Sequence, residues 1–453
     1  MSRALPAAPV PVTFVILSFL CPTELSLYVE GLRLPPHRVA LIILFPFAVW
    51  RLVSTSDVRV RLFDLLFVAF GAMTVGVFIH HADGHEGLVY GGSLALESTG
   101  GYLVARAFVR DLETFLGALK VMFAAIVVAM VIALPETLLG QLFVHDFLAS
   151  VTGYVHPTGL ETRMGLTRAY GTFDHPIHYG TFCAAMLALF CYADRQSTSA
   201  RKRAVFLLFA TILGLSSAPL LCLGLQCAMI VWEKSTRAVP SRTTLTMAVL
   251  TGLYIGASMF SNRSPIAFIA TGMTFDSWTG YYRLQIWEHG MNNVWAHPWT
   301  GIGLAEWERP WWMVSSTVDA FWLVITMRQG IPSFLVLALA IVLLARATVK
   351  RAGRSQDLRL RKLMMGWMMS LIAMCLIGCT VHYWNVLNAY FFFFLGLAGA
   401  LADPRRAAAP AIVSASQRQA LRSRGSIGPR APLPEGAFSH PGLPYDRMLH
   451  GRR

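Results

Sequence analysis

Apolar residues recur along this chain in long runs, and charged residues fall almost entirely between the runs. The runs approach the ~20 residues that a helix needs to cross a bilayer core, and they do not alternate with polar residues as barrel strands do. This pattern predicts an all-α, polytopic membrane protein with about twelve spans. The expected spans are 10–28, 38–52, 62–80, 88–106, 114–136, 177–193, 204–217, 218–232, 243–260, 318–345, 363–381 and 384–402.

Composition supports this prediction. Apolar residues make up 55% of the 453 residues, only 14% are charged, and the mean hydropathy is +0.54, which excludes an ordinary soluble protein of this length. The formal charge of +14 would suit nucleic acid, but its placement between spans indicates a membrane topology signal instead, so no nucleic-acid partner is expected. All seven cysteines lie within or at the ends of apolar runs, which excludes a disulfide framework or zinc pattern in the polar loops.

The distribution of basic residues predicts the orientation. With the first run uncleaved and the N-terminus inside, 29 of the 38 Lys and Arg residues face the cytoplasm. Both termini are then cytoplasmic, and two large loops, 137–176 and 261–317, lie outside. Residues 1–403 form the membrane domain, and 404–453 read as a disordered basic tail that can rest on anionic membrane lipid. The outer basic residues are Arg33, Arg38, Arg163, Arg168, Arg263, Arg283 and Arg309.

One stretch tests this topology. Residues 204–232 are largely apolar, too long for one ordinary span and short for two. A single crossing would place the strongly basic loop 346–362 outside, so two short helices are favoured, turning at Ser216-Ser217-Ala218-Pro219. Because helices this short cannot span the whole core, the turn should lie below the outer surface and form a polar dimple there.

The second outer loop contains a predicted surface helix. Arg283 and Trp287 are four residues apart and therefore share a face. His297-Pro298 should end the helix, and Gly301 and Gly303 permit a tight turn back towards the bilayer.

Several motifs, in this order and topology, resemble the O-antigen ligase and Wzy-type polysaccharide polymerase superfamily, most closely its exopolysaccharide-polymerase branch. The resemblance covers most of the membrane domain and implies a C-type glycosyltransferase that uses no metal or other cofactor. Its substrate would be an undecaprenyl-diphosphate-linked oligosaccharide at the periplasmic face of the bacterial inner membrane, and a partner protein could regulate chain length. The motifs are GLRLPPHR, ESTGGYLVAR, GTFDHPIHYG, SSAP, YYRLQIW, HPWTGIG and VDAFWLVITMRQGIP.

Such a reaction must neutralise a departing diphosphate and orient an acceptor hydroxyl. Arginine suits the first task because its planar fork meets phosphate oxygens bidentately, so Arg283 and Arg168 are the leading candidates. Asp319 and His175 are candidates for the second task. Further candidates for substrate binding are Arg263, Arg163, Arg309 and Trp287.

Simpler roles remain open for these residues. Arg283 could snorkel from a surface helix, and Asp319 could only complement a helix dipole. Ligases of the family typically carry His-Asn where this chain has Val318-Asp319, which weighs against a ligase-type catalytic histidine. A ligase that transfers glycan to a lipid acceptor is the alternative function.

A polysaccharide transporter or flippase is a further alternative, suggested by Glu97 and Arg328 within spans. The expected repeat of related halves is not seen in the sequence. Because these two residues have opposite charge and similar estimated depth, we expect them to pair with one another.

Overall fold

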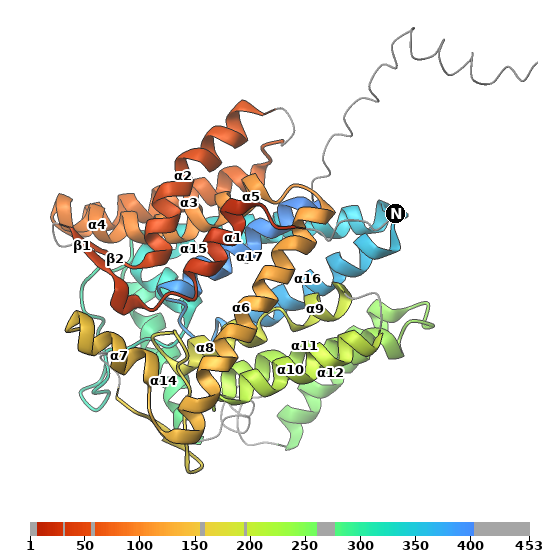
Figure 1. The fold of residues 1–453 in the computed structure, drawn as a ribbon. Coiled ribbons are helices and arrows are strands. Elements are labelled where there is room, and N and C mark those ends of the chain that lie inside the picture. Colours follow the sequence, from red (N-terminus) through yellow and green to blue (C-terminus); the bar gives the residue numbers. More distant parts are fainter. Residues whose placement is uncertain are drawn as a thin grey trace, which may run out of the picture. The chain divides into compact units, whose positions relative to one another are not determined.

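The computed structural model describes residues 7–29, 32–55, 59–154, 159–193, 197–260 and 277–402, all within one compact unit. The tail and Arg263 lie outside this part of the chain. The described residues are mostly helical, with two small hairpins (Figure 1). The helices and short turns are α1 (Val10–Ser18), η1 (Thr23–Leu25), α2 (Pro36–Ser54), α3 (Leu62–His81), α4 (Gly84–Ala95), η2 (Leu96–Gly100), α5 (Gly101–Phe108), α6 (Leu112–Leu139), α7 (Phe143–Thr152), α8 (Pro176–Ala184), α9 (Leu187–Ala193), α10 (Ser197–Ile212), α11 (Ser217–Ser235), α12 (Arg242–Phe260), α14 (Ser277–Ala296), α15 (Phe321–Arg354), α16 (Leu358–Ile377) and α17 (Val386–Ala402). The strands are β1 (Leu27–Val29), β2 (Leu32–Leu34), β3 (Thr162–Arg163) and β4 (Leu166–Thr167).

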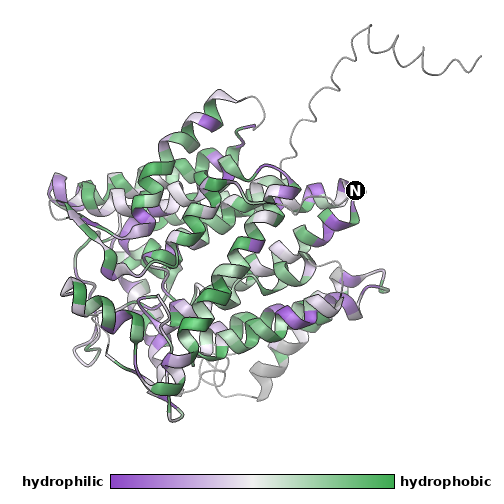
Figure 2. Ribbon diagram, in the orientation of Figure 1, coloured by the Kyte–Doolittle hydropathy of each residue, from purple (hydrophilic) through white to green (hydrophobic). Residues whose placement is uncertain are grey.

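Six segments in this part of the chain are long and apolar enough to cross a membrane. They are Pro36–Ser54, Leu62–His81, Leu112–Leu139, Pro176–Ala193, Phe321–Arg354 and Leu358–Ile377, and Val386–Ala402 is a shorter apolar helix. Apolar residues dominate the helices, while polar residues gather at their ends and in the connections (Figure 2). The prediction of an all-α membrane protein is therefore confirmed, whereas the number of spans and their orientation stay predictions.

The expected first span is wrong. Helix α1 has nine residues, about 14 Å of helix, which is far short of a bilayer core. Pro22 has no backbone N–H to continue a helix, and the chain instead forms η1 and the antiparallel β1–β2 hairpin, where Leu27 pairs with Leu34. The apolar run alone could not reveal that its second half is extended.

The turn within residues 204–232 is confirmed, but the helices are longer than expected. Helix α10 ends at Ile212 and α11 begins at Ser217, so the turn lies just before most of the predicted Ser216–Pro219 stretch. The helices have 16 and 19 residues, about 24 and 28 Å, which approaches the thickness of a bilayer core. Leu215 in this turn has a positive φ of 41°, a strained conformation for a leucine. Two other outer-loop predictions also hold: α14 ends at Ala296, and Gly301 and Gly303 adopt φ values of 66° and 59°.

Helix α17 is the centre of the packing. Every residue from Val386 to Leu401 is buried, and this helix packs against α5, α15 and η2. The predicted fourth span is continuous through α4, η2 and α5, but η2 is a single π-helical turn. Such turns are uncommon and are found frequently at functional sites, and this one carries Glu97.

Helix α15 is broken where the segment before it folds back onto it. Gly330 has φ 81° and ψ 165°, which only glycine adopts without strain. The chain before α15 pairs with the broken turn: Ile302 N donates to Met327 O at 2.9 Å, and Gly303 N donates to Arg328 O at 3.0 Å. Ile331 N donates in turn to Pro298 O at 2.8 Å. The break therefore fixes the side chains of Arg328 and its neighbours.

We predict that Gly330→Ala lowers the thermal midpoint of the purified protein. A Cβ at this position would lie 2.2 Å from Trp299 O and would also strain the backbone, at a cost of at least about 1–3 kcal/mol. Gly224→Ala is the matched control, because a Cβ there meets nothing within 4 Å and alanine favours a helix. An equal effect of the two changes would contradict the role given to the break.

Candidate functional site

Five residues predicted from the sequence line one cavity of about 150 Å³, which we call the arginine cavity. They reach it from separate parts of the chain: the segment around β3 and β4, the start of α8, helix α14, and the residues just before α15. The turn between α10 and α11 closes the cavity, so the predicted polar dimple forms part of its wall. The lining residues are Arg163, Arg168, His175, Ile177, Ser216, Ser217, Ala218, Thr279, Arg283 and Asp319.

The turn between α10 and α11 positions two of the arginines. Arg163 donates from Nη1 to the Leu215 carbonyl at 2.9 Å, and Arg168 donates from Nη2 to Ser216 Oγ at 2.7 Å. Arg168 also forms an ion pair with Glu161. These contacts hold two like charges near one another, which would otherwise repel.

Two helices begin at the cavity. His175 is the N-cap of α8, and Ser216 is the N-cap of α11, whose side chain makes no capping hydrogen bond. At α11 the first N–H groups have no partner within the helix, and the helix dipole makes that end favourable for an anion. At α8 only the dipole contributes, because Pro176 has no N–H and the next two N–H groups donate to His175. The cavity therefore combines arginine charges with helix N-termini.

Of the three arginines, Arg283 gives the clearest indication that the cavity binds an anion. It is 8% exposed, and its Nε is buried with no hydrogen-bond partner among the residues that the structure describes. Burial lowers the pKa of its guanidinium, and the carboxyl group of Asp319 opposes that shift. A buried guanidinium nitrogen without an acceptor is costly, so the geometry favours a bound anion.

Asp319 and His175 offer different hydrogen-bonding groups to the cavity. Burial raises the pKa of the Asp319 carboxyl, and Arg283 partly opposes this rise. His175 Nδ1 accepts a hydrogen bond from Ile177 N at 3.1 Å, so a neutral His175 carries its proton on Nε2. His175 is therefore suited to donate a hydrogen bond to an anion, whereas Asp319 is the better proton acceptor.

Two of the remaining predicted binding residues, Arg309 and Trp287, are described by the structure and do not line this cavity. Arg309 donates to Met313 O at 2.8 Å and forms an ion pair with Glu306. The indole N–H of Trp287 donates to Cys379 O at 2.7 Å. Arg283 lines the arginine cavity and Trp287 does not, so the two side chains do not share one binding surface. The position of Arg263 lies outside the described residues.

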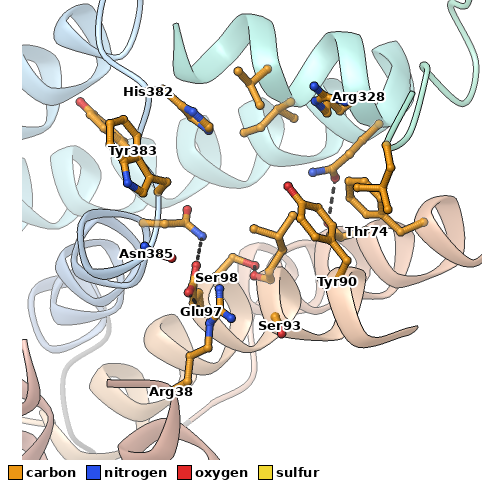
Figure 3. A pocket seen from close by; sticks show the side chains of 18 of the residues that line it. Arg38, Thr74, Tyr90, Ser93, Glu97, Ser98, Arg328, His382, Tyr383 and Asn385 are labelled. Atoms are coloured by element: carbon orange, nitrogen blue, oxygen red, sulfur yellow. Dashed lines mark hydrogen bonds and ion pairs between the residues drawn. The ribbon is translucent and has the colours of Figure 1, made fainter. Parts of the chain in front are cut away.

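A larger cavity of about 350 Å³ lies among α3, α4, η2, α15, α17 and the residues before α17 (Figure 3). Its walls combine aromatic rings, such as Tyr90 and Trp384, with polar and charged side chains. The charged and amide groups that line it are Arg33, Arg38, Glu86, Glu97, Arg328, Gln329, Asn385 and Asn388.

The expected pairing of Glu97 with Arg328 is wrong. Glu97 Oε1 accepts from Arg38 Nε at 2.7 Å and lies 3.2 Å from His37 Nε2, and Oε2 accepts from Asn388 at 3.1 Å. Arg328 donates instead to the carbonyls of Gly303 and Ala305 at 2.8 and 2.9 Å. The depth estimate failed because α2 packs against η2, which brings a residue assigned to a loop end onto the buried carboxylate.

Sequence reasoning missed the link between the two cavities. Asp174 Oδ2 accepts from Asn385 Nδ2 at 2.8 Å, and Asp174 directly precedes His175. The Trp384 ring lies 6.0 Å from the His175 ring and 3.7 Å from the His178 ring. Asn385 has a positive φ of 49°, a conformation that asparagine tolerates, but the sequence gives no sign that this residue faces the GTFDHPIHYG motif.

We predict that Glu97→Gln and Arg38→Gln each lower the yield and thermal midpoint of folded protein. Each change leaves the other charge buried and unmatched, which costs about 3–5 kcal/mol. The Arg38→Gln/Glu97→Gln double variant should recover part of the loss, whereas Arg328→Gln/Glu97→Gln should not. Recovery only with the second combination would contradict the pairing seen here.

In comparisons with known proteins, no family model matches the chain, and no match is found among curated proteins.

Proposed function

We propose that this protein is a membrane-embedded polysaccharide polymerase, and that the arginine cavity binds the diphosphate of a lipid-linked glycan donor. The observation that carries the proposal is the convergence of Arg163, Arg168 and Arg283 on one small cavity at two helix N-termini. A diphosphate supplies the anionic oxygens that these donors require. The resemblance to lipid-linked glycan polymerases names the donor as an undecaprenyl-diphosphate-linked oligosaccharide at the periplasmic face of the bacterial inner membrane.

The reaction proceeds by substitution at the anomeric carbon of the donor. The acceptor hydroxyl oxygen forms a bond to this carbon as the bond from carbon to phosphate oxygen breaks. The electron pair of that bond remains on the leaving diphosphate, where Arg168 and Arg283 offset the growing charge. Asp319 accepts the hydroxyl proton, and His175 donates a hydrogen bond to a phosphate oxygen.

The carboxylate at position 319 favours a polymerase over the ligase alternative. Ligases of the resembling family typically carry His-Asn where this chain has Val318-Asp319. In this protein Asp319 lines the cavity beside Arg283, and the carboxyl pKa is raised by burial, which suits a proton acceptor. The transporter alternative gains no support from Glu97 and Arg328, because Glu97 is paired within a buried network and Arg328 holds backbone carbonyls.

We predict that Arg283→Ala and Arg168→Ala each reduce polymer formation by about 10²–10³-fold at matched membrane levels, because each removes a donor from the departing diphosphate. Lysine at either position should restore activity only in part, since it lacks the planar fork. Arg309→Ala is the control, as this arginine lies in an outer loop but outside the cavity. Full polymer yield from both alanine variants would exclude the proposed role.

We also predict an acid limb in the pH profile of the polymerisation rate. A proton acceptor must be deprotonated, and the pKa of Asp319 is raised, so the rate should fall as the pH drops towards a midpoint above the ordinary value of about 4. Asp319→Glu should keep the limb with reduced activity, whereas Asp319→Asn should lose about 10²–10⁴-fold of the rate. Measurements in proteoliposomes test this; an unchanged rate and limb in Asp319→Asn would assign the proton to another group.

A further inference from the structure

The larger cavity contains hydrogen-bonding groups that the protein itself does not use. Gln329 Oε1 accepts from Thr74 Oγ1 at 2.8 Å, but its amide nitrogen donates to none of the described residues. The Tyr90 hydroxyl and the ring nitrogens of His382 likewise have no hydrogen-bond partner among them. Figure 3 shows that Tyr90, Arg328 and His382 surround one space from three different elements. A ligand rich in hydroxyl groups would satisfy such donors and acceptors.

The cavity also carries a cation without a matching carboxylate. Arg38 is paired with Glu97, which leaves that pair neutral within the wall. Arg328 contacts only the carbonyls of Gly303 and Ala305, and none of the described carboxylates lies within ion-pair distance of it. The His382 imidazole cannot balance this charge, because an imidazole is neutral or cationic; burial and Arg328 lower its pKa to about 4, so it adds no second positive charge. Counting all the charged groups that line the cavity, three arginines (Arg33, Arg38 and Arg328) face two carboxylates (Glu86 and Glu97), and the net positive charge favours an anionic ligand.

The shape of the cavity suits a sugar. Its volume of about 350 Å³ lies at the lower end of the range usual for small-molecule sites, roughly 300–1,000 Å³. Aromatic rings such as those of Tyr90 and Trp384 offer apolar faces with polar groups beside them. Trp384 and Asn385 contact His175 and Asp174, so this cavity adjoins the arginine cavity.

We infer that the larger cavity binds an acidic sugar of the acceptor glycan, with its carboxylate on Arg328 and its hydroxyls on Gln329 and Tyr90. The assignment to an acceptor rests on the proposed function. A sugar in this cavity would lie close to the arginine cavity, because Trp384 and Asn385 contact His175 and Asp174.

The test uses two probes that differ only in charge: tetragalacturonate and its fully methyl-esterified form. Binding of each is measured to the purified full-length protein in nanodiscs of a neutral lipid, without any lipid diphosphate. The wild type should bind the free acid at least about tenfold more tightly than the ester, since the ester lacks the negative charge. The discrimination should persist in Arg309→Gln, a control arginine outside both cavities.

Gln329→Glu is the decisive variant. The new carboxylate can still accept from Thr74, so the fold has no reason to change, but it neutralises Arg328 and removes the amide donor. This variant should bind both probes equally, as should Arg328→Gln. Equal binding of the two probes by the wild type, no measurable binding of either at millimolar concentration, or discrimination that survives Gln329→Glu would each overturn the inference.

A third variant separates this inference from the proposed function. Arg283→Ala should leave the preference for tetragalacturonate unchanged, because Arg283 lines the other cavity. Loss of the preference in Arg283→Ala but not in Gln329→Glu would place the acid in the arginine cavity and overturn the inference. Failure of the proposed function would instead appear as full polymer formation by Arg283→Ala, with the probe results unaffected.

Discussion

The site depends on the cost of burying arginine. Arg168 and Arg283 are both largely removed from water, and Arg163 lies beside them, so these charges lose hydration and repel one another. The protein offsets this cost only in part, through the carboxyl groups of Glu161 and Asp319, the Ser216 hydroxyl and the carbonyls of the α10–α11 turn. Arg283 keeps a buried Nε without an acceptor in the described structure. A bound diphosphate would complete the arrangement.

This requirement gives a reason for several irregular features of the fold. The turn between α10 and α11 supplies the carbonyls that hold two arginines. The break at Gly330 lets the segment before α15 pair with this helix, which fixes Arg328 and Gln329 at the larger cavity. The hydrogen bond between Asp174 and Asn385 joins the walls of the two cavities. Each irregularity thus lies where helices alone could not place the necessary side chains.

The sequence predicted much of this arrangement. The apolar runs and the charges between them predicted the helical class and the turn between α10 and α11. Both predictions depend only on the length of each run and on where charged residues fall, which can be read from the sequence alone. Arg163, Arg168, His175, Arg283 and Asp319 were all expected at the site, and the structure brings them together.

Other features depend on long-range packing and were not predictable in this way. The partner of Glu97 is determined by how α2 packs on η2. Near the start of the chain, Pro22 interrupts an apolar run, and the chain leaves the helical conformation there. The larger cavity joins residues from distant segments, such as Tyr90, Arg328 and His382, and no single motif contains more than one of these three. Periodicity and spacing carry no information about which helices become neighbours.

The affinity of the purified protein for sugar-free undecaprenyl diphosphate tests the central claim most directly. In nanodiscs of neutral lipid, the account predicts that the diphosphate binds at least about tenfold more tightly than undecaprenyl monophosphate, a difference of about 1.4 kcal/mol. This preference should disappear in Arg283→Ala. Equal affinity for the two lipids in the wild type, or an unchanged preference in Arg283→Ala, would contradict the account.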